Sequence, residues 1–216
     1  MKILLFEDNN VGDLYPIALT RGVFDIMCGG LTLQQALKHQ FPEATFDYFV
    51  RDYLKAVVDR KFKPDDAGDD HVLFINAAVV PDLLTLKELG DKMKDGKDFV
   101  LKKNNIIVAT YINNLSIYVK FSSENVLNYL EGLKIEEESF EGRAFQYIHD
   151  VIIYSQEILK SNLEILSENY SKHANGVFVG GGVVIEDNVV LDSSEGPIIL
   201  SDDVKVEAFT KLRGPL

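Results

Sequence analysis

The chain contains a single cysteine, Cys28, among its 216 residues. One thiol cannot form a disulfide within the chain, and it excludes a cysteine-rich zinc module. Such scarcity of cysteine fits a protein kept in a reducing compartment. Cys28 lies between Met27 and Gly29 in an apolar stretch, which favours a buried structural thiol over the alternative, a reactive nucleophile.

The sequence also lacks a hydrophobic run long enough for a signal peptide or a membrane span. Its first apolar run covers only residues 3–6, and no later segment approaches the length of a span. Basic residues are in the minority, because 34 acidic against 22 basic side chains give a net charge of −12. A field of that sign repels nucleic acid and anionic lipid, and the lysines of residues 92–103 are interleaved with acids. We therefore expect a soluble cytoplasmic protein with no nucleic-acid or membrane partner.

The sequence does contain the alternation of strands and helices that is typical of an α/β domain. Hydrophobic residues make up 46% of the chain, which suits one or two globular domains of this length. We predict strands over residues 2–6, 45–50, 71–76, 98–101 and 105–112, and helices over residues 32–38, 52–59, 81–89, 125–133 and 144–168. The predicted organisation is one α/β domain with its linking helix over residues 1–172, and a different second domain over residues 173–216.

A six-residue period marks the second domain. Apolar residues recur every six positions in two registers, and a small or β-branched residue follows most of them four positions later. This period predicts the start of a parallel β-helix of hexapeptide repeats, and an ordinary pair of β-hairpins is the alternative. Because a solenoid needs about three stacked repeats and a polar cap, we expect the natural protein to continue past Leu216. The repeating positions are Val179, Ile185 and Leu191, then Leu200, Val206 and Leu212.

The segment that joins the first strand to the first helix, residues 5–32, holds most of the polar residues of the predicted site. Ligands of open α/β sheets bind outside the carboxyl ends of the strands, where this segment lies. Triphosphates need backbone N–H groups and cations, and usually a carboxylate that holds Mg²⁺. Taken alone, the segment also fits a long structural loop pinned by local hydrogen bonds. Its candidate residues are Asn9, Asn10, Gly12, Arg21, Gly29 and Thr32.

The same segment resembles the opening of the sugar nucleotidyltransferase family, which includes the bifunctional N-acetylglucosamine-1-phosphate uridyltransferase and glucosamine-1-phosphate acetyltransferase. The likeness is closer to a variant branch whose opening reads roughly LFDD…LxPLTxTRPVxDLRxGxxT. It continues at residues 74–77, Asp150, residues 191–198 and residues 213–215, and so spans the whole chain. The matching positions of the opening are Leu5-Phe6-Glu7-Asp8, Leu14-Tyr15-Pro16-Ile17, Leu19-Thr20-Arg21, Phe24-Asp25-Ile26, Gly29 and Thr32.

The resemblance implies a Rossmann-like α/β nucleotidyltransferase domain followed by the start of a left-handed parallel β-helix. The implied reaction joins UTP to N-acetylglucosamine 1-phosphate, forms UDP-N-acetylglucosamine and releases pyrophosphate, with Mg²⁺ bridging the phosphates. The β-helix of such proteins commonly forms a homotrimer and carries an acyltransferase site between subunits. That site would lie beyond Leu216.

Several positions depart from the family pattern and remove positive charge. Asp13 stands where the usual glycine-rich loop has an arginine, and Val23 falls near its lysine. Asn76 replaces the strand-end aspartate that helps to hold Mg²⁺, and Met27 replaces an arginine of the variant branch. Lost cations weaken phosphate binding. The alternative to an active enzyme is therefore a degenerate domain with a binding or assembly role beside a β-helix acyltransferase, and a further alternative is an acyltransferase alone.

We expect Arg21 to contact phosphate and to be catalytic together with Asp25. The asparagines Asn9, Asn10 and Asn76 are expected to contact base, ribose or metal-bound water. Nucleotide binding is also predicted for Asp8, Gly12, Thr20, Gly29 and Thr32.

Two carboxylates are candidates for the Mg²⁺ site, namely Asp25 and Asp150. The alternative for Asp25 is that it orients Arg21 through a salt bridge. For Asp150 the alternative is an ordinary carboxylate on the surface of a helix, and we expect its neighbour His149 to pack rather than to act in catalysis.

Overall fold

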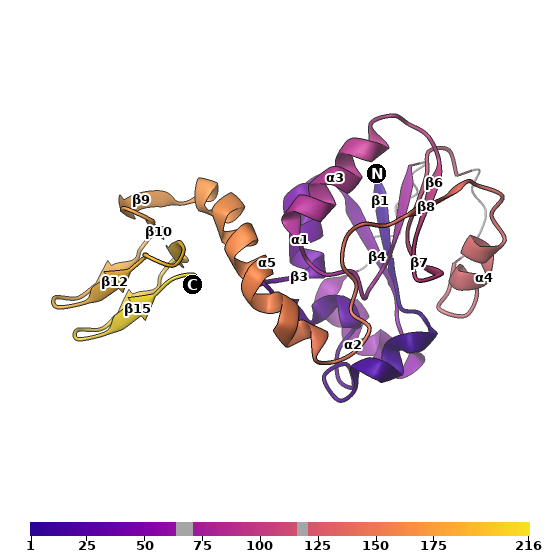
Figure 1. Cartoon of the computed structure of the whole chain (residues 1–216). Coiled ribbons are helices and arrows are strands. Elements are labelled where there is room, and N and C mark those ends of the chain that lie inside the picture. Colours follow the sequence, from indigo (N-terminus) through magenta and orange to yellow (C-terminus); the bar gives the residue numbers. More distant parts are fainter. Residues whose placement is uncertain (64–70, 116–120) are drawn as a thin grey trace. The chain divides into compact units, whose positions relative to one another are not determined.

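The computed structural model describes residues 1–63, 71–115 and 121–216 (Figure 1). These residues form two compact units, Met1–Ile153 and Tyr154–Leu216. No helix in the described ranges is both long enough and apolar enough to cross a membrane.

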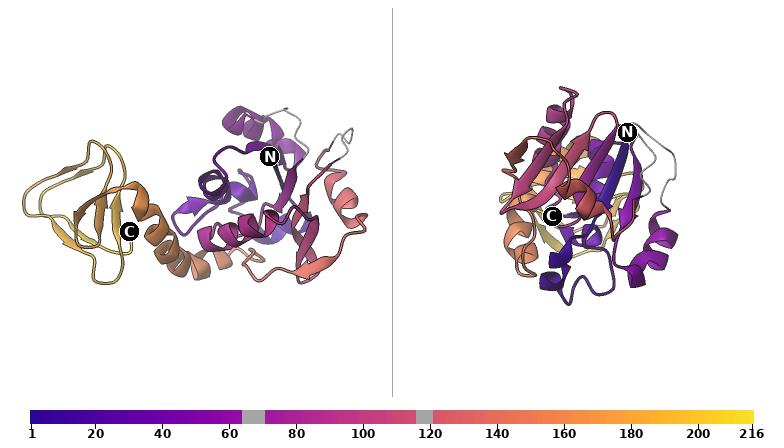
Figure 2. Two further views of the ribbon diagram at one scale, coloured as in Figure 1. Left: turned by 90° about the horizontal axis from the view of Figure 1, so that it is seen from above. Right: turned by 90° about the vertical axis from the view of Figure 1, so that its right-hand side faces the viewer.

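A six-stranded sheet forms the centre of the first unit, in the order β4-β1-β5-β7-β6-β8, and Figure 2 shows its strands side by side. Strands β4 (Thr45–Phe49), β1 (Lys2–Phe6) and β5 (Val72–Asn76) run parallel to one another. Strand β7 pairs antiparallel with both of its neighbours, and β8 pairs parallel with β6. The last three strands are β6 (Phe99–Lys103), β7 (Ile106–Ile112) and β8 (Glu137–Ser139).

The burial of each parallel strand explains its place in the sheet. Every residue of β5 is buried, as a central strand covered on both faces requires. In β4, half-buried and buried residues alternate, as an edge strand with one covered face requires. The predicted α/β domain is confirmed, and its parallel strands β4, β1 and β5 are consistent with a Rossmann-like arrangement.

Helices cover both faces of this sheet. Helices α1 (Leu33–Gln40) and α3 (Leu83–Met93) lie side by side on one face, with α4 (Val126–Glu131) on the other (Figure 1). Helix α2 (Asp52–Phe62) connects β4 to β5. The face under α4 is a core of buried apolar side chains that includes Leu4, Phe6, Val72, Phe74, Val126 and Leu130.

The last helix, α5 (Asp150–Leu166), begins six residues later than the sequence predicted. Its apolar spacing extends back toward Ala144, but the backbone there pairs with the segment after β5 instead. Ala144 forms a bridge with Val79, and the N–H of Phe145 donates to the carbonyl oxygen of Ala78 at 2.7 Å. These tertiary hydrogen bonds outweigh the local helical pattern, so residues 144–149 are a separate connection.

The second unit consists of most of α5, from Tyr154 on, a short 3₁₀ turn and many short strands. Three pairs of these strands run parallel, and each pairing joins residues 21 positions apart, as in Val179 with Leu200. The other predicted repeat positions also pair, Ile185 with Val206 and Leu191 with Leu212. The strands are β9 (Ser171–Ala174), β10 (Val177–Val179), β11 (Val184–Ile185), β12 (Val190–Asp192), β13 (Ile198–Leu200), β14 (Lys205–Val206) and β15 (Lys211–Arg213).

Candidate functional site

A cavity of about 200 Å³ lies at the carboxyl ends of β1 and β5. This is the edge of the sheet where open α/β folds bind their ligands. Glu7 and Asp8, which directly follow β1, form one part of the wall, and Asn76 ends β5 in another part. The remaining lining residues are Asn10, Val11, Asp13, Leu14, Val23, Ala77, Ala78, Ile106, Phe145, Gln146 and Tyr147. Among these described lining residues there is neither a lysine nor an arginine.

The side chain of Asn76 fixes the position of Asp8. Asn76 is 2% exposed, and its Nδ2 donates to Oδ2 of Asp8 at 2.8 Å and to the carbonyl oxygen of Ile107 at 3.2 Å. Its Oδ1 accepts from the N–H of Ala78 at 2.9 Å. Both amide hydrogens are therefore used within the protein. Asn76 acts as an internal brace that holds Asp8 at the cavity.

Asp8 also begins the short 3₁₀ helix Asn9–Leu14 (η1) that follows β1. Its Oδ1 accepts from the N–H of Asn10 at 2.8 Å, which is a capping bond. The predicted binding residues Asp8, Asn10 and Asn76 thus meet at one cavity. Asn9 lines an adjacent hollow instead, together with Lys102 of β6 and Asn105 of the β6–β7 turn.

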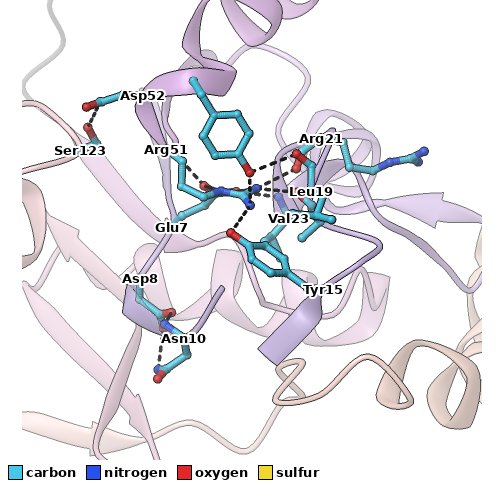
Figure 3. Close-up of polar contacts among 12 residues, drawn as sticks. Glu7, Asp8, Asn10, Tyr15, Leu19, Arg21, Val23, Arg51, Asp52 and Ser123 are labelled. Atoms are coloured by element: carbon cyan, nitrogen blue, oxygen red, sulfur yellow. Dashed lines mark hydrogen bonds and ion pairs between the residues drawn. The ribbon is translucent and has the colours of Figure 1, made fainter. Parts of the chain in front are cut away.

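A cluster around Arg51 ties the segment after η1 to the ends of the strands (Figure 3). Arg51 follows β4, and its Nε donates to Oε2 of Glu7 at 3.0 Å. Its Nη2 donates to Oε1 of Glu7 at 3.2 Å, and to the carbonyl oxygens of Ala18 and Arg21 at 2.8 and 2.9 Å. Glu7 is 3% exposed at its side chain, and Oε1 also accepts from the N–H of Val23. We call Glu7, Arg51 and the groups bound to them the Arg51 cluster.

Two tyrosines complete the Arg51 cluster. The Nη1 atom donates to the hydroxyl oxygens of Tyr15 at 3.3 Å and Tyr53 at 3.0 Å. Burial disfavours the charged guanidinium, but the hydrogen bonds to Glu7 and Tyr15 outweigh burial and raise the pKa of Arg51. Every nitrogen of the guanidinium therefore has an acceptor within the protein. Arg51 therefore holds this part of the protein together. Because all of its nitrogens are used within the protein, none is left to bind phosphate.

The two predicted catalytic residues lie outside the cavity wall. The side chain of Arg21 is exposed and points away from Glu7 and Arg51, while its carbonyl oxygen binds Arg51 (Figure 3). Asp25 pairs with Lys61 of α2. Asp25 therefore forms its salt bridge with Lys61 and not with Arg21, because α2 brings that lysine to Asp25.

Two of the other predicted binding residues, Gly29 and Thr32, have local structural roles. Gly29 is in the tight turn between β2 (Met27–Cys28) and β3 (Leu31–Thr32), where it has a φ of 62°. A hairpin turn of this kind requires a positive φ, which glycine adopts readily. Thr32 begins α1, where its hydroxyl accepts from the N–H of Gln35 and forms a capping box. Gly12 and Thr20 are exposed.

The carboxylate of Asp150 does not line the cavity. Its Oδ2 accepts from the backbone N–H groups of Gln146 and Tyr147 at 2.8 and 2.9 Å, and the residue is 8% exposed. The described residues contain no group of three His, Cys, Asp or Glu side chains that could hold a metal ion. Mg²⁺ commonly takes about one or two protein carboxylates together with substrate phosphates. Asp8 fits that mode, because its carboxylate lines the cavity.

Cys28 is a buried structural thiol, as the sequence predicted. Burial raises the pKa of the Cys28 thiol to about 11, and Sγ lies 3.6 Å from the carbonyl oxygen of Val151. A thiol with so high a pKa stays protonated at neutral pH and is a poor nucleophile.

Sequence reasoning missed Arg51 and the wall segment of residues 145–147. One signal for Arg51 was present, since it directly follows a predicted strand whose carboxyl end lies at the ligand-binding edge. No comparable signal marked residues 145–147, because their apolar spacing reads as helix.

Comparison with known proteins identifies the family of the chain. No curated protein matches it. A family model described as "Sugar nucleotidyl transferase" matches residues 3–171, which include the cavity and all of the central sheet except Lys2. The match supports the family level of the resemblance and not its uridyltransferase–acetyltransferase branch. The chain belongs to the sugar nucleotidyl transferase family.

Proposed function

We propose that the first unit transfers a nucleotidyl group from a nucleoside triphosphate to a sugar 1-phosphate in the cavity at the carboxyl ends of β1 and β5. The family match supports this reaction class. The observation that carries the proposal is the position of Asp8, which Asn76 and the N–H of Asn10 hold at the cavity.

In the proposed reaction, an oxygen of the sugar phosphate attacks the α-phosphorus of the nucleotide. The bond between the α-phosphorus and the bridging oxygen breaks, and pyrophosphate leaves with that oxygen. Catalysis of such a transfer depends mainly on positioning the anions and stabilising charge. UTP and N-acetylglucosamine 1-phosphate are the specific substrates we propose, on the strength of the sequence resemblance.

The charge of the cavity supports a role for Mg²⁺ as cofactor. Glu7, Asp8 and Asp13 contribute carboxylates to the wall, and Arg51 neutralises only Glu7. A bare triphosphate would be repelled by the other two carboxylates. Asp8 would hold the Mg²⁺ of a metal–nucleotide complex, and the ion would neutralise phosphate charge.

A second candidate function follows from the same charge pattern. The described lining residues include no lysine or arginine, and the guanidinium of Arg51 is fully used within the protein. A domain that binds a sugar nucleotide without turning it over, and that has an assembly role beside the second unit, would tolerate this loss of cations.

The second unit supports a further part of the proposal. Its strands pair in parallel between residues 21 positions apart, and its repeat positions share an apolar interior. This is the arrangement expected at the start of a left-handed β-helix. We propose that this β-helix begins near residue 173, that it mediates a homotrimer, and that the protein works in the cytoplasm.

The enzymatic proposal is tested by pyrophosphate release from the 216-residue chain with UTP, N-acetylglucosamine 1-phosphate and Mg²⁺. We expect turnover that Asp8→Asn lowers about 100-fold, the size of effect seen when one group that stabilises transition-state charge is lost. Asp91→Asn is the matched control, because Asp91 is exposed and pairs only with Lys94 at the end of α3 among the described contacts. Nucleotide binding without any pyrophosphate release would instead establish the second candidate.

A further inference from the structure

One wall of the cavity is built by the connection that precedes α5. The carbonyl oxygen of Arg143 accepts from the N–H of Val80 at 2.9 Å, and the N–H of Phe145 donates to the carbonyl oxygen of Ala78. The bridge between Val79 and Ala144 lies between these two bonds. Residues 143–145 are thus fastened to the segment that leaves the carboxyl end of β5.

The next two residues are fixed from the other side. The buried carboxylate of Asp150 accepts from the N–H groups of both Gln146 and Tyr147. Their backbone is therefore held between β5 and the first turn of α5. Their side chains, in contrast, are exposed, and both line the cavity. Tyr147 is 51% exposed, so its ring is accessible to a ligand in the cavity.

The ring of Tyr147 has one covered face. His149 lies parallel to it, with ring centroids 5.5 Å apart and an angle of 6° between the planes. A stacked neighbour restricts the rotation of the tyrosine ring and leaves its opposite face for another planar group. Stacking needs no positive charge, so it suits a cavity wall made of carboxylates, amides and apolar groups.

We propose that Tyr147 stacks on the base of the nucleotide and that Gln146 reads the edge of that base. This inference rests on the proposed function and adds the residues that select the nucleotide. The carboxamide of Gln146 offers a donor and an acceptor, which is the pair of groups needed to distinguish one base edge from another. The base then lies against residues 146–147, and its phosphates extend toward Asp8, which lines the same cavity.

The absence of tryptophan from the chain provides a direct test. Tyr147→Trp introduces a single tryptophan whose emission is quenched when a base stacks on it. We expect saturable quenching by UTP in the presence of Mg²⁺, and none by inorganic tripolyphosphate, which has no base. Phe209→Trp is the matched control, because Phe209 is 84% exposed and does not line the cavity.

Substitutions that do not introduce a tryptophan provide a second test, through their effect on the affinity for nucleotides. Tyr147→Ala is expected to weaken binding of UTP about 10- to 100-fold, while Tyr147→Phe keeps near-normal affinity because the ring remains. Tripolyphosphate binding should not change in either variant. Gln146→Leu is expected to reduce the difference in affinity between UTP and CTP, because the leucine side chain can neither donate nor accept a hydrogen bond at the base edge.

The outcomes separate this inference from the proposed reaction. Quenching by UTP without pyrophosphate release by the unaltered chain would support base stacking and overturn the catalytic function. Turnover by the unaltered chain that Tyr147→Ala leaves unchanged would overturn the role of Tyr147 and leave the catalytic function standing. Equal quenching in the Tyr147→Trp and Phe209→Trp variants, or no quenching in either, would also contradict the inference.

Discussion

Replacing Arg51 with alanine is expected to lower the free energy of unfolding of the first unit by about 3 kcal/mol, the cost of removing one partner of a buried ion pair. The carboxylate of Glu7, 3% exposed, would remain in the protein without its guanidinium partner. The carbonyl oxygens of Ala18 and Arg21 would lose a donor at the same time. The segment they belong to would then be less firmly held over the cavity.

Urea unfolding followed by circular dichroism measures this effect. Arg51→Lys should destabilise the protein almost as much as Arg51→Ala, because an ammonium group cannot donate in the planar, forked geometry that the Arg51 cluster uses. Arg21→Ala is the matched control, and a change within about 0.5 kcal/mol is expected for its exposed side chain. A loss below about 1 kcal/mol for Arg51→Ala would show that the cluster contributes no more than a surface salt bridge.

Replacing Asn76 with aspartate is expected to have a comparable effect, although the two side chains are nearly the same size. The new carboxylate would be buried beside Oδ2 of Asp8, at the site where an amide nitrogen now donates at 2.8 Å. It would also lose the bond to the carbonyl oxygen of Ile107. We expect a destabilisation of about 3 kcal/mol at pH 7 from the unmade hydrogen bonds and the repulsion between like charges.

The pH dependence of this variant gives a second check. Burial and the neighbouring Asp8 raise the pKa of the introduced carboxyl in the folded state above its unfolded value. The protonated form can still donate to Asp8, so the decrease in the free energy of unfolding relative to the unaltered chain is smallest at acidic pH. It grows as pH rises from the unfolded pKa toward the raised pKa of the folded state. A loss that is independent of pH, or one no larger than that of the exposed control Asn9→Asp, would contradict the proposed bracing of Asp8 by Asn76.

The fold of the first unit could be predicted because its elements carry their own patterns. Strand β5 can be predicted from its apolar run and strand β4 from its alternating pattern, and each pattern covers only a few neighbouring residues. The start of α5 could not be read in this way. Its apolar period continues to Ala144, but the partner that stops the helix, Val79, lies far away in the sequence. Local pattern and tertiary pairing conflict there, and the tertiary pairing determines the structure.

The site was predicted in part for the same reason. Asp8 and Asn76 lie at the ends of neighbouring parallel strands, so the sequence placed them at one edge, and the structure brings them within hydrogen-bonding distance. Gly29 and Thr32 are positioned by turn and cap chemistry, which uses the same residue types as phosphate binding. Arg51 directly follows a predicted strand, which places it near the site, but its partners become apparent only when Glu7 and the segment of residues 15–23 fold against it.

Calorimetric titration of the 216-residue chain with UTP, with and without Mg²⁺, tests the central claim that the cavity at the ends of β1 and β5 binds a nucleotide. We predict saturable binding of one equivalent per chain that requires Mg²⁺ and is lost in Asp8→Ala, while Asp91→Ala binds normally. Binding that survives the loss of Asp8 would place the nucleotide elsewhere. No heat with UTP or with any other nucleoside triphosphate would contradict the account, and would mean that the loss of cations from the wall of the cavity has ended nucleotide binding.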